Sequence, residues 1–239
     1  SLSWEINVLA AQQLAEYSIR NDVKQFIYAS SGSVYGVKEE PEVTEDLSLV
    51  PISIYNKTKM VAERVLLSYQ DRMKIHCIRP ATVCGYSPRQ RLDVVVNILA
   101  NFAYHKREIF VFGGDQLRPN IHIKDMVEAY MVLLDVPKEK IAGEIFNAGY
   151  ENQPVKKLAE TVKSIVGEDV KLIITPSNDN RSYHISSGKI KAELGFETRH
   201  TIREAISDLC AAFDKNLLPD SLDNEMYFNI KRMQSLNLS

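Results

Sequence analysis

Cysteines are few and long apolar runs are absent, and each shortage excludes a class of protein. The 239 residues include three cysteines, Cys77, Cys84 and Cys210, which lie far apart and form no CxxC pair or Cys/His cluster. Neither a disulfide framework nor a metal site is therefore expected, and a reducing cytoplasm is the predicted compartment. No apolar run approaches the roughly 18 residues of a membrane span, and the first residues lack the basic and then apolar order of a signal peptide. The sequence predicts a soluble chain with no membrane partner.

An excess of charge of one sign is also lacking. The chain has 29 Lys and Arg against 31 Asp and Glu, spread along its length, for a net charge of −2. It therefore offers no electrostatic surface for nucleic acid or an anionic membrane. A few local arginines can still bind an anionic substrate. Because 45% of the residues are apolar, the chain has enough material for a core and for one or two domains.

The first third of the sequence alternates helical and strand patterns. Apolar residues recur at helical spacing over residues 3–20 and again over 54–70. The short runs KQFIYAS and KIHCIRP combine aromatic and β-branched residues, and they predict buried strands. Helix, strand, helix, strand is typical of a parallel sheet with crossover helices. The loop that starts at Ser30 then lies at the carboxyl end of a strand, where side chains can face a ligand.

The rest of the chain predicts a second set of shorter elements. An α/β half up to about residue 85 is followed, over 86–239, by a smaller α/β lobe interleaved with returning elements of the sheet. No internal repeat is visible. We expect helices over residues 92–105, 124–134, 155–166, 187–194 and 202–213, and strands over 108–112, 120–123, 143–149 and 170–174.

Tyr55 and Lys59 form the pair with the clearest chemical meaning. They lie four residues apart near the start of a predicted helix, so both project from one face. A nearby ammonium favours the phenolate and lowers the pKa of a tyrosine, which suits Tyr55 to act as a general base. Ser31, at the end of the preceding strand, has a hydroxyl that can share the proton being moved. Alone, such a pair is also explained by a helix that buries its tyrosine and exposes its lysine.

Three sequence motifs, in the order in which they occur, favour the catalytic interpretation of Tyr55 and Lys59 over this simpler explanation. They are FIYASSGSVYG, then YNKTKMVAERVL, whose tyrosine comes 24 residues after Ser31, and then IRPATVCGY. Together they resemble the extended short-chain dehydrogenase/reductase family, in its NAD-dependent nucleotide-sugar epimerase/dehydratase branch. The resemblance covers residues 6–213, and EINVLAAQQLAE and FGGDQLRPNIHIKDMVEAY extend it. It implies a Rossmann-type doubly wound parallel sheet, with residues 1–85 as the later part of the dinucleotide-binding domain and 86–239 mainly as a substrate-binding lobe.

The resemblance also implies roles for individual residues. Ser31 matches the residue that hydrogen-bonds the reacting hydroxyl, Tyr55 matches the catalytic base, and Lys59 matches the lysine that holds the nicotinamide ribose. The implied cofactor is NAD rather than NADP. Besides Tyr55 and Lys59, its implied contacts are Ala29, Ser30, Pro80, Ala81 and Thr82.

A nucleotide-sugar substrate is implied in the same way. Arg118 and Arg181 match arginines that bind the nucleotide diphosphate, since a guanidinium can bond two phosphate oxygens at once. For both, a surface position is the alternative, as it is for Arg89 and Arg91 in the loop SPRQRLD. The remaining implied substrate contacts are Ser31, Gly32 and Ser33.

Three other features carry a lesser expectation. Asn7 resembles an asparagine that faces the cofactor, with a helix-surface position as the alternative. His122 is expected to pack against or cap a helix. Relatives dimerise through the helices that correspond to residues 3–20 and 54–70, so a homodimer through these helices is implied.

The sequence departs from the family pattern at its start. Residues 1–239 contain neither the family's GxxGxxG loop nor the acidic residue that reads the adenosine ribose. We therefore expect residues 1–239 to be a fragment that binds the cofactor weakly or not at all. The activity then belongs to the longer protein.

A second departure concerns the reaction. Dehydratases of this branch commonly carry acidic residues at the two positions after the catalytic serine or threonine, where this chain has Gly32 and Ser33. Neither can act as a general acid or base near neutral pH, which disfavours dehydration. The leading hypothesis is an NAD-dependent epimerase that oxidises the sugar at C4. The alternatives are a 4-dehydrogenase or a 4-keto-sugar reductase of the same family, and, outside catalysis, a degenerate binding subunit that lacks the cofactor loop.

Overall fold

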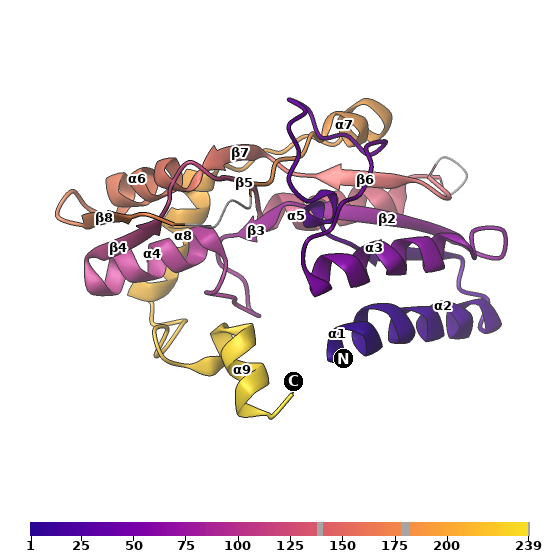
Figure 1. Cartoon of the computed structure of the whole chain (residues 1–239), viewed down its shortest axis with the longest axis horizontal. Helices are drawn as coiled ribbons and strands as arrows, with labels where there is room; N and C mark the ends of the chain where they lie inside the picture. Colours follow the sequence, from indigo (N-terminus) through magenta and orange to yellow (C-terminus); the bar gives the residue numbers. More distant parts are fainter. Residues whose placement is uncertain (138–140, 178–181, 239) are drawn as a thin grey trace. The chain divides into compact units, whose positions relative to one another are not determined.

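The computed structural model describes residues 1–137, 141–177 and 182–238, and it contains two compact units (Figure 1). The chain returns twice to the first unit after leaving it. The first unit holds Ser1–Ala81, Val127–Gly149 and Tyr183–Glu197, and the second holds Thr82–Met126, Tyr150–Ser182 and Thr198–Ser239.

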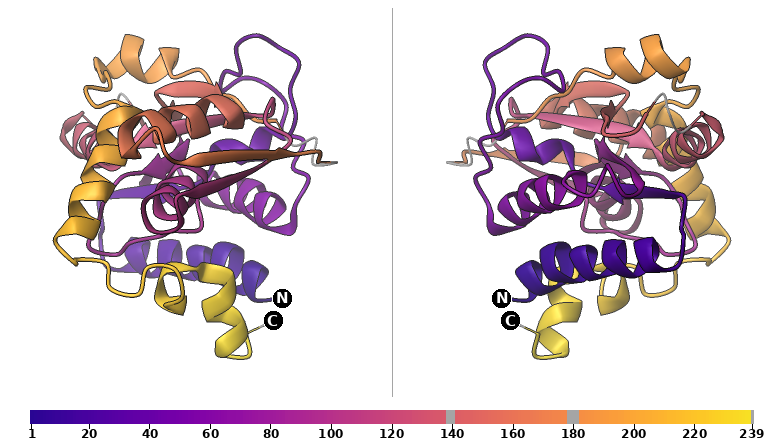
Figure 2. Two further views of the ribbon diagram at one scale, coloured as in Figure 1. Left: turned by 90° about the vertical axis from the view of Figure 1, so that its left-hand side faces the viewer. Right: turned by 90° about the vertical axis from the view of Figure 1, so that its right-hand side faces the viewer.

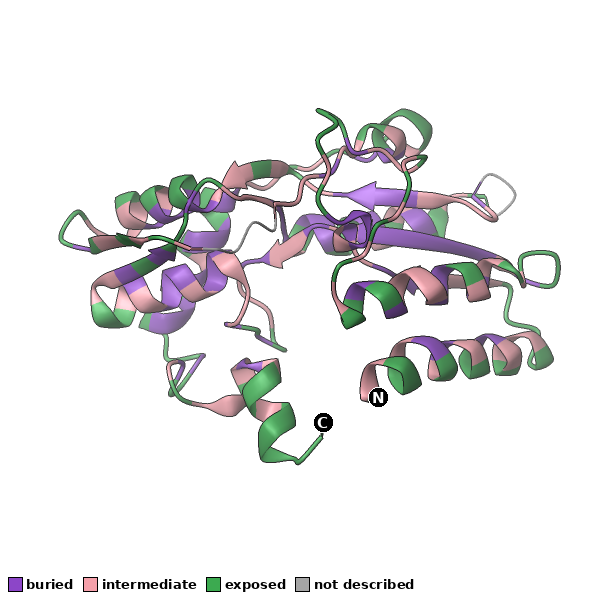
Figure 3. Ribbon diagram, in the orientation of Figure 1, coloured by how far each residue is buried: buried purple, intermediate pink, exposed green. Residues whose placement is uncertain are grey.

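The first unit is built on a parallel sheet. Its strands are β1 (Gln25–Ala29), β2 (Lys74–Pro80) and β6 (Ile145–Ala148), in the spatial order β1-β2-β6. β2, the middle strand, is buried along most of its length, as Figure 3 shows. Ala29 pairs with Ile78, and Pro80 pairs with Ala148. The carboxyl ends of the three strands therefore lie along one edge of the sheet, as predicted for a crossover topology.

Two helical segments pack together on this sheet. α1 (Leu2–Trp4), a π-helical turn η1 (Glu5–Ala10) and α2 (Ala11–Arg20) form one continuous stretch beside α3 (Ile54–Leu67), as Figure 2 shows. Their shared core includes Ala15, Ala62, Leu66, Ile75 and Cys77, all fully buried. The small alanine side chains allow the two helices to approach closely.

α3 ends earlier than the predicted boundary at residue 70. Ser68 caps the helix, and its hydroxyl donates to the carbonyl oxygen of Val65 at 2.7 Å. The amide of Tyr69 then bonds the carbonyl of Leu66 at 3.0 Å, so the chain tightens into turns. The apolar pattern continues past Leu67 because residues in these turns also pack against the core.

Shorter segments complete the first unit. A 3₁₀ turn, η2 (Gly32–Tyr35), follows β1 directly, and α7 (Gly188–Leu194) packs against β6. The later turns of α5 (Ile123–Asp135) belong to this unit, and the Gln25 side chain donates to the carbonyl oxygen of Leu133 at 2.8 Å.

The second unit has a mixed sheet and a separate strand pair. β3 (Thr82–Cys84) and β7 (Glu151–Pro154) flank β5 (Leu117–His122), with β3 parallel and β7 antiparallel to it. β4 (Glu108–Phe112) pairs in parallel with β8 (Lys171–Thr175). Three helices, α4 (Val95–Lys106), α6 (Val155–Val166) and α8 (Ile202–Asp214), contribute Val96, Ala100, Leu158, Val162, Ile206 and Leu209 to its core.

The expected α/β fold class is confirmed, with differences at short elements. β4 and α6 have the predicted bounds, whereas β3, β7, a 3₁₀ turn η4 (Glu225–Tyr227) and α9 (Asn229–Ser235) were not predicted. Across the described ranges, no helix has the length and apolar character needed to cross a membrane.

Candidate active site

Ser31 lies where the chain leaves the sheet. β1 ends at Ala29, and the amide of Ser30 extends the ladder by one more bond, to the carbonyl of Ile78 at 2.8 Å. Ser31 is extended (φ −158°, ψ 139°), and its hydroxyl accepts from the amide of Ser33 at 3.3 Å, which caps η2. The hydroxyl is therefore held at the carboxyl edge of a parallel sheet, the usual ligand edge of such folds.

Gly32 allows this loop to approach the end of β2. A Cβ atom at this position would lie 3.2 Å from the carbonyl oxygen of Pro80 and 3.1 Å from Cγ2 of Ile185. A larger side chain would push the loop away from the neighbouring strand end. The loops after β1 and β2 therefore sit close together, which places Ser31 near Pro80 and Ala81. Thr82 follows as the first residue of β3, in the second unit.

Tyr55 and Lys59 come to the same edge from α3. The hydroxyl of Ser53 caps this helix by accepting from the amide of Asn56 at 3.1 Å. The Lys59 Nζ atom lies 5.8 Å from the centre of the Tyr55 ring and donates to the carbonyl oxygen of Ala29 at 2.9 Å. Tyr55 is 47% exposed. The phenol is thus accessible, and the ammonium lies between it and the end of β1.

The environment of Lys59 affects its charge. Burial lowers the pKa of its ammonium group, while the Glu63 carboxylate acts in the opposite direction. The Nζ atom also lies 4.9 Å from the centre of the Tyr28 ring. Burial raises the pKa of the Tyr28 phenol. Tyr28 is 7% exposed and Tyr55 is 47% exposed, so Tyr55 is the phenol beside Lys59 that a ligand can reach.

Ser33 connects the serine loop to α3. Its Oγ lies 2.8 Å from Oγ of Ser31 and donates to Oδ1 of Asn56, also at 2.8 Å. Asn56 is 4% exposed and adjacent to Tyr55 in α3. No sequence pattern indicated Asn56, because a helical asparagine is usually a surface residue.

A buried ion pair behind the site was also missed. Arg79, 2% exposed, binds both carboxylate oxygens of Glu63, and its Nη1 atom donates to the Tyr35 hydroxyl at 2.7 Å. Two signals were present in the sequence. An arginine inside the buried strand KIHCIRP requires a partner, and Glu63 continues the four-residue spacing of Tyr55 and Lys59.

Three of the predicted substrate arginines, Arg89, Arg91 and Arg118, belong to the second unit. Arg89 donates to the carbonyl oxygens of Gln90 and Met226, at 3.0 and 3.3 Å, and so holds the C-terminal segment. Arg91 pairs with Asp93 at 2.9 Å, and Arg118 in β5 donates to the carbonyl oxygen of Leu117, also at 2.9 Å. Arg181 lies outside the described residues.

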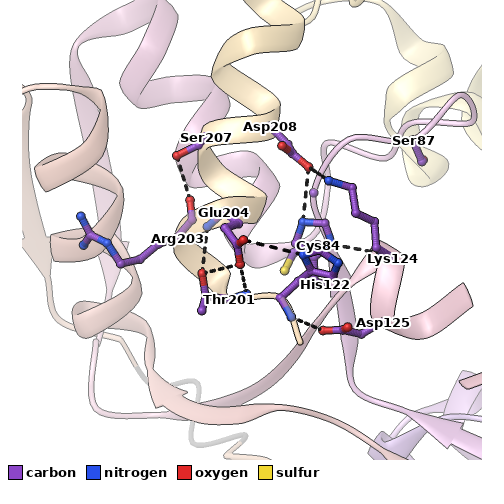
Figure 4. Close-up of polar contacts among 12 residues, drawn as sticks. Cys84, Ser87, His122, Lys124, Asp125, Thr201, Arg203, Glu204, Ser207 and Asp208 are labelled. Atoms are coloured by element: carbon purple, nitrogen blue, oxygen red, sulfur yellow. Dashed lines mark hydrogen bonds and ion pairs between the residues drawn. The ribbon is translucent and has the colours of Figure 1, made fainter. Parts of the chain in front are cut away.

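His122 and Asn7 have structural partners. The His122 Nδ1 atom accepts from the amide of Lys124 at 3.0 Å, in the first turn of α5, which agrees with its expected capping role (Figure 4). Lys124 in turn pairs with Asp208 of α8 at 2.8 Å. Asn7 donates to Thr58 Oγ1 at 3.0 Å and so joins the first helical stretch to α3.

A comparison with protein families identifies the chain. Residues 1–149, which carry Ser31, Tyr55, Lys59 and the parallel sheet, match the model of the NAD dependent epimerase/dehydratase family. The chain belongs to this family. The predicted membership in the extended short-chain dehydrogenases/reductases is confirmed.

Curated family members include several sugar-nucleotide epimerases. An uncharacterized UDP-glucose epimerase, YtcB, from Bacillus subtilis is 31% identical over 168 residues, which are 70% of this chain and 52% of that protein. A UDP-glucose 4-epimerase from Corynebacterium glutamicum is 25% identical over 87% of this chain and 69% of its own length. The chain spans about half the length of the Bacillus relative and of a putative UDP-arabinose 4-epimerase from Arabidopsis thaliana.

Solved structures of family members agree with the fold. UDP-glucose 4-epimerase from Thermotoga maritima, with UDP-glucose, has a TM-score of 0.80 at 27% identity, over 90% of this chain and 71% of that one. UDP-glucuronic acid 4-epimerase from Bacillus cereus, with UDP-glucuronic acid and NAD, has a TM-score of 0.79 at 25% identity, over 89% and 68%. The Rossmann-like fold class predicted from the sequence is confirmed.

The residues at the sheet edge fit the reactive end of the family's cofactor. The Ser30 hydroxyl is buried and has no hydrogen-bond partner within the described part of the chain. A buried hydroxyl without a partner is costly, and a polar ligand would satisfy it. The Lys59 ammonium, which donates to the carbonyl oxygen of the preceding residue Ala29 at 2.9 Å, has further N–H donors for ribose hydroxyls.

Proposed function

We propose that this chain carries the catalytic centre of an NAD-dependent nucleotide-sugar 4-epimerase. The observation that supports this most is the Lys59 ammonium, 5.8 Å from the Tyr55 ring and bonded to the last residue of β1. A cation beside an accessible phenol, at the ligand edge of a parallel sheet, is a suitable arrangement for removing a proton from an alcohol.

Each of the three central residues has a role in this proposal. Tyr55, as phenolate, takes the proton from the C4 hydroxyl of the sugar and later returns it. Lys59 stabilises the phenolate electrostatically and holds ribose hydroxyls. Ser31 bonds the C4 oxygen and keeps it in reach of Tyr55.

The cofactor is assigned to the edge formed by the ends of β1 and β2. When bound, NAD would supply the acceptor for the hydride on C4, and return of that hydride to either face of the sugar would give the epimer. Ala29 and Ser30 contribute a carbonyl oxygen and a buried hydroxyl, while Tyr55 and Lys59 face the ribose. The loop of Pro80, Ala81 and Thr82 completes the proposed set of contacts.

The proposed substrate is a UDP-sugar. Relatives of this chain include 4-epimerases of UDP-glucose, UDP-arabinose and UDP-glucuronic acid. We assign the diphosphate to Arg118 and Arg181, with Arg89 and Arg91 in the loop after β3 as further candidates, because guanidinium groups bind phosphate oxygens in pairs. Gly32 and Ser33 are assigned to the sugar.

Epimerisation is favoured over dehydration by the residues after Ser31. Gly32 has no side chain, and the Ser33 hydroxyl is bonded to Ser31 and Asn56. Elimination of water needs a group that titrates near neutral pH, and neither residue supplies one. A 4-dehydrogenase or 4-keto-sugar reductase would leave a net change in NADH, so the assay below also separates these reactions.

We further propose the wider organisation of the protein. Residues 1–85 are assigned to dinucleotide binding and 86–239 mainly to substrate binding, in a cytoplasmic homodimer formed through the helices at 3–20 and 54–70. The support for the dimer is a set of large apolar side chains exposed on the first helical stretch: Trp4, Ile6, Leu9, Leu14 and Tyr17. Sedimentation that shows only monomer at micromolar concentration would contradict this assembly.

The test of the proposed function is an epimerase assay of the full-length protein with UDP-glucose and NAD. We expect UDP-galactose to form without net accumulation of NADH. Tyr55→Phe should abolish this turnover and still bind UDP-glucose, because only the acidic proton is lost. Turnover retained by Tyr55→Phe would refute the assignment of the base. Accumulation of NADH would instead identify a dehydrogenase.

A further inference from the structure

Ser31, Ser33 and Asn56 form a chain of hydrogen bonds with a defined direction. Both links, from Ser31 Oγ to Ser33 Oγ and from there to Asn56 Oδ1, measure 2.8 Å. A side-chain carbonyl oxygen can only accept, so the proton in the second link comes from Ser33. Since a serine has one hydroxyl proton, the first link must use the proton of Ser31.

The Ser31 hydroxyl is therefore a donor. Its proton points to Ser33, and one lone pair already accepts from the amide of Ser33 at 3.3 Å. Because Asn56 holds the Ser33 proton, Ser33 cannot donate to Ser31, so Ser31 keeps its own proton as a donor that can turn to a ligand oxygen.

Asn56 is held firmly enough to set this direction. It is 4% exposed, and its amide nitrogen in the backbone donates to the Ser53 cap at 3.1 Å. The residue also stands next to Tyr55 at the first turn of α3. A change at Asn56 is therefore transmitted to Ser31 through Ser33, over two short bonds.

We propose that Ser33 and Asn56 are positioning residues that set the direction of the Ser31 hydroxyl and so let it serve both forms of the sugar. This inference rests on the proposed function. When the sugar is bound, as alcohol or as ketone, the Ser31 proton turns from Ser33 to the C4 oxygen, and Ser33 keeps its bond to Asn56. The one proton of the C4 hydroxyl is then left directed to Tyr55.

The hydrogen bonds from Ser31 through Ser33 to Asn56 do not carry away the proton that leaves the sugar. An asparagine amide does not take up a proton near neutral pH, so the chain ends at Asn56. The proton of the C4 hydroxyl goes to Tyr55, and Ser31 and Ser33 have the same number of protons before and after the step. Removal of Ser33 should therefore reduce the rate without moving the acidic limb of its pH profile.

The test measures epimerisation of UDP-glucose in the presence of NAD, in the protein as the cell makes it. We expect Ser33→Ala to lower kcat about tenfold, the equivalent of one hydrogen bond in the transition state, with KM changed less than about twofold. Ser33→Thr, which keeps the hydroxyl, should restore most of the rate. Ser68→Ala removes an exposed hydroxyl from the end of the same helix and should leave kcat unchanged.

A second variant tests whether the residues act as one chain. Asn56→Ala should lower kcat by a similar factor, and the double variant with Ser33→Ala should lose little more, because both changes break the same path. If Asn56→Ala does not fold, as judged by circular dichroism, the comparison of Ser33→Ala with Ser33→Thr decides alone.

The outcomes separate this inference from the proposed function. Full activity in Ser33→Ala, equal losses in Ser33→Ala and Ser33→Thr, or a shifted acidic limb would overturn the inference while the epimerase assignment stands. Absence of epimerisation by the unmodified protein would overturn both. A tenfold loss of kcat in Ser33→Ala that Ser33→Thr restores supports the positioning role of Ser33.

Discussion

Arg79 binds Glu63 through two parallel hydrogen bonds inside the first unit. Nε lies 2.8 Å from one carboxylate oxygen, and Nη2 lies 2.7 Å from the other. Glu63 is on α3, four residues after Lys59, whereas Arg79 is near the end of β2. The pair therefore ties the helix that carries Tyr55 and Lys59 to the middle strand of the sheet. The pair thereby holds α3 in position relative to the carboxyl ends of the strands.

Breaking this pair from one side should be costly. Glu63→Gln leaves the Arg79 charge buried without its counterion, and we expect the free energy of unfolding to fall by about 3–5 kcal/mol. Urea denaturation of the variant and of the unmodified chain measures the difference. Glu160→Gln, at an exposed site on α6, is the control and should change stability by less than about 0.5 kcal/mol. An equally small effect of Glu63→Gln would show that the pair does not hold α3 in place.

The charge of Lys59 should control the pH at which Tyr55 works. Lys59→Met removes the ammonium near the phenol, so the pKa of the base rises and the acidic limb of kcat/KM moves to higher pH. At pH 7 we expect a loss of at least about tenfold, which corresponds to a shift of one pH unit. Lys57→Met, two residues earlier and exposed, should leave the profile in place. A profile unchanged by Lys59→Met would separate the lysine from the base.

His76 should make the fold sensitive to acid. It is fully buried in β2, and burial lowers its pKa from 6.5 to about 4. Between these values the unfolded chain binds a proton that the native chain does not, so stability is complete above pH 6.5 and falls as the pH drops toward 4. The slope from this group is about 1.4 kcal/mol per pH unit.

A single variant isolates that contribution. His76→Gln keeps a polar partner for the Gln25 amide, which lies 3.3 Å from the His76 ring, but has no group that titrates. We expect unfolding in urea at pH 5 and pH 7 to differ less in the variant than in the unmodified chain. Identical pH dependence in the two proteins would mean that His76 does not stay neutral in the native state.

The start of α8 depends on a capping box. Thr201 accepts from the amide of Glu204 at 3.1 Å, and Glu204 accepts from the amide of Thr201 at 2.6 Å. Thr201→Ala removes one side of this exchange and should lower the free energy of unfolding by about 1 kcal/mol. Thr161→Ala lies inside α6, where alanine is the better helix former, and should cost nothing. A thermal melt of both variants measures the contrast, and equal effects would contradict the capping role.

Elements with strong local patterns could be predicted closely. β4 and α6 have the expected bounds because their alternating or helical periodicity is complete within the segment. β7, with the sequence ENQP, has no such pattern. It forms because it pairs with β5, where Gln153 lies opposite Arg118. A strand of this kind depends on pairing with its neighbour, so its own sequence does not predict it.

The candidate site divides in the same way. Tyr55 and Lys59 could be paired from the sequence, since four residues make about one helical turn and place both side chains on one face. Glu63 with Arg79, and Ser33 with Asn56, are separated by 16 and 23 residues, and they meet only after α3 packs beside the strand ends. Local sequence patterns do not identify which distant residue becomes the partner.

The sequence by itself determined the order of the strongly patterned helices and strands, the parallel α/β class and the turn of helix that carries phenol and amine together, because backbone periodicity and i to i+4 geometry are local. Only the tertiary structure decided which strand lies in the middle, which charges are buried against each other and which hydroxyl faces Ser31. Those outcomes depend on packing and desolvation between segments that are distant along the chain, and the energies involved exist only once the segments are in contact.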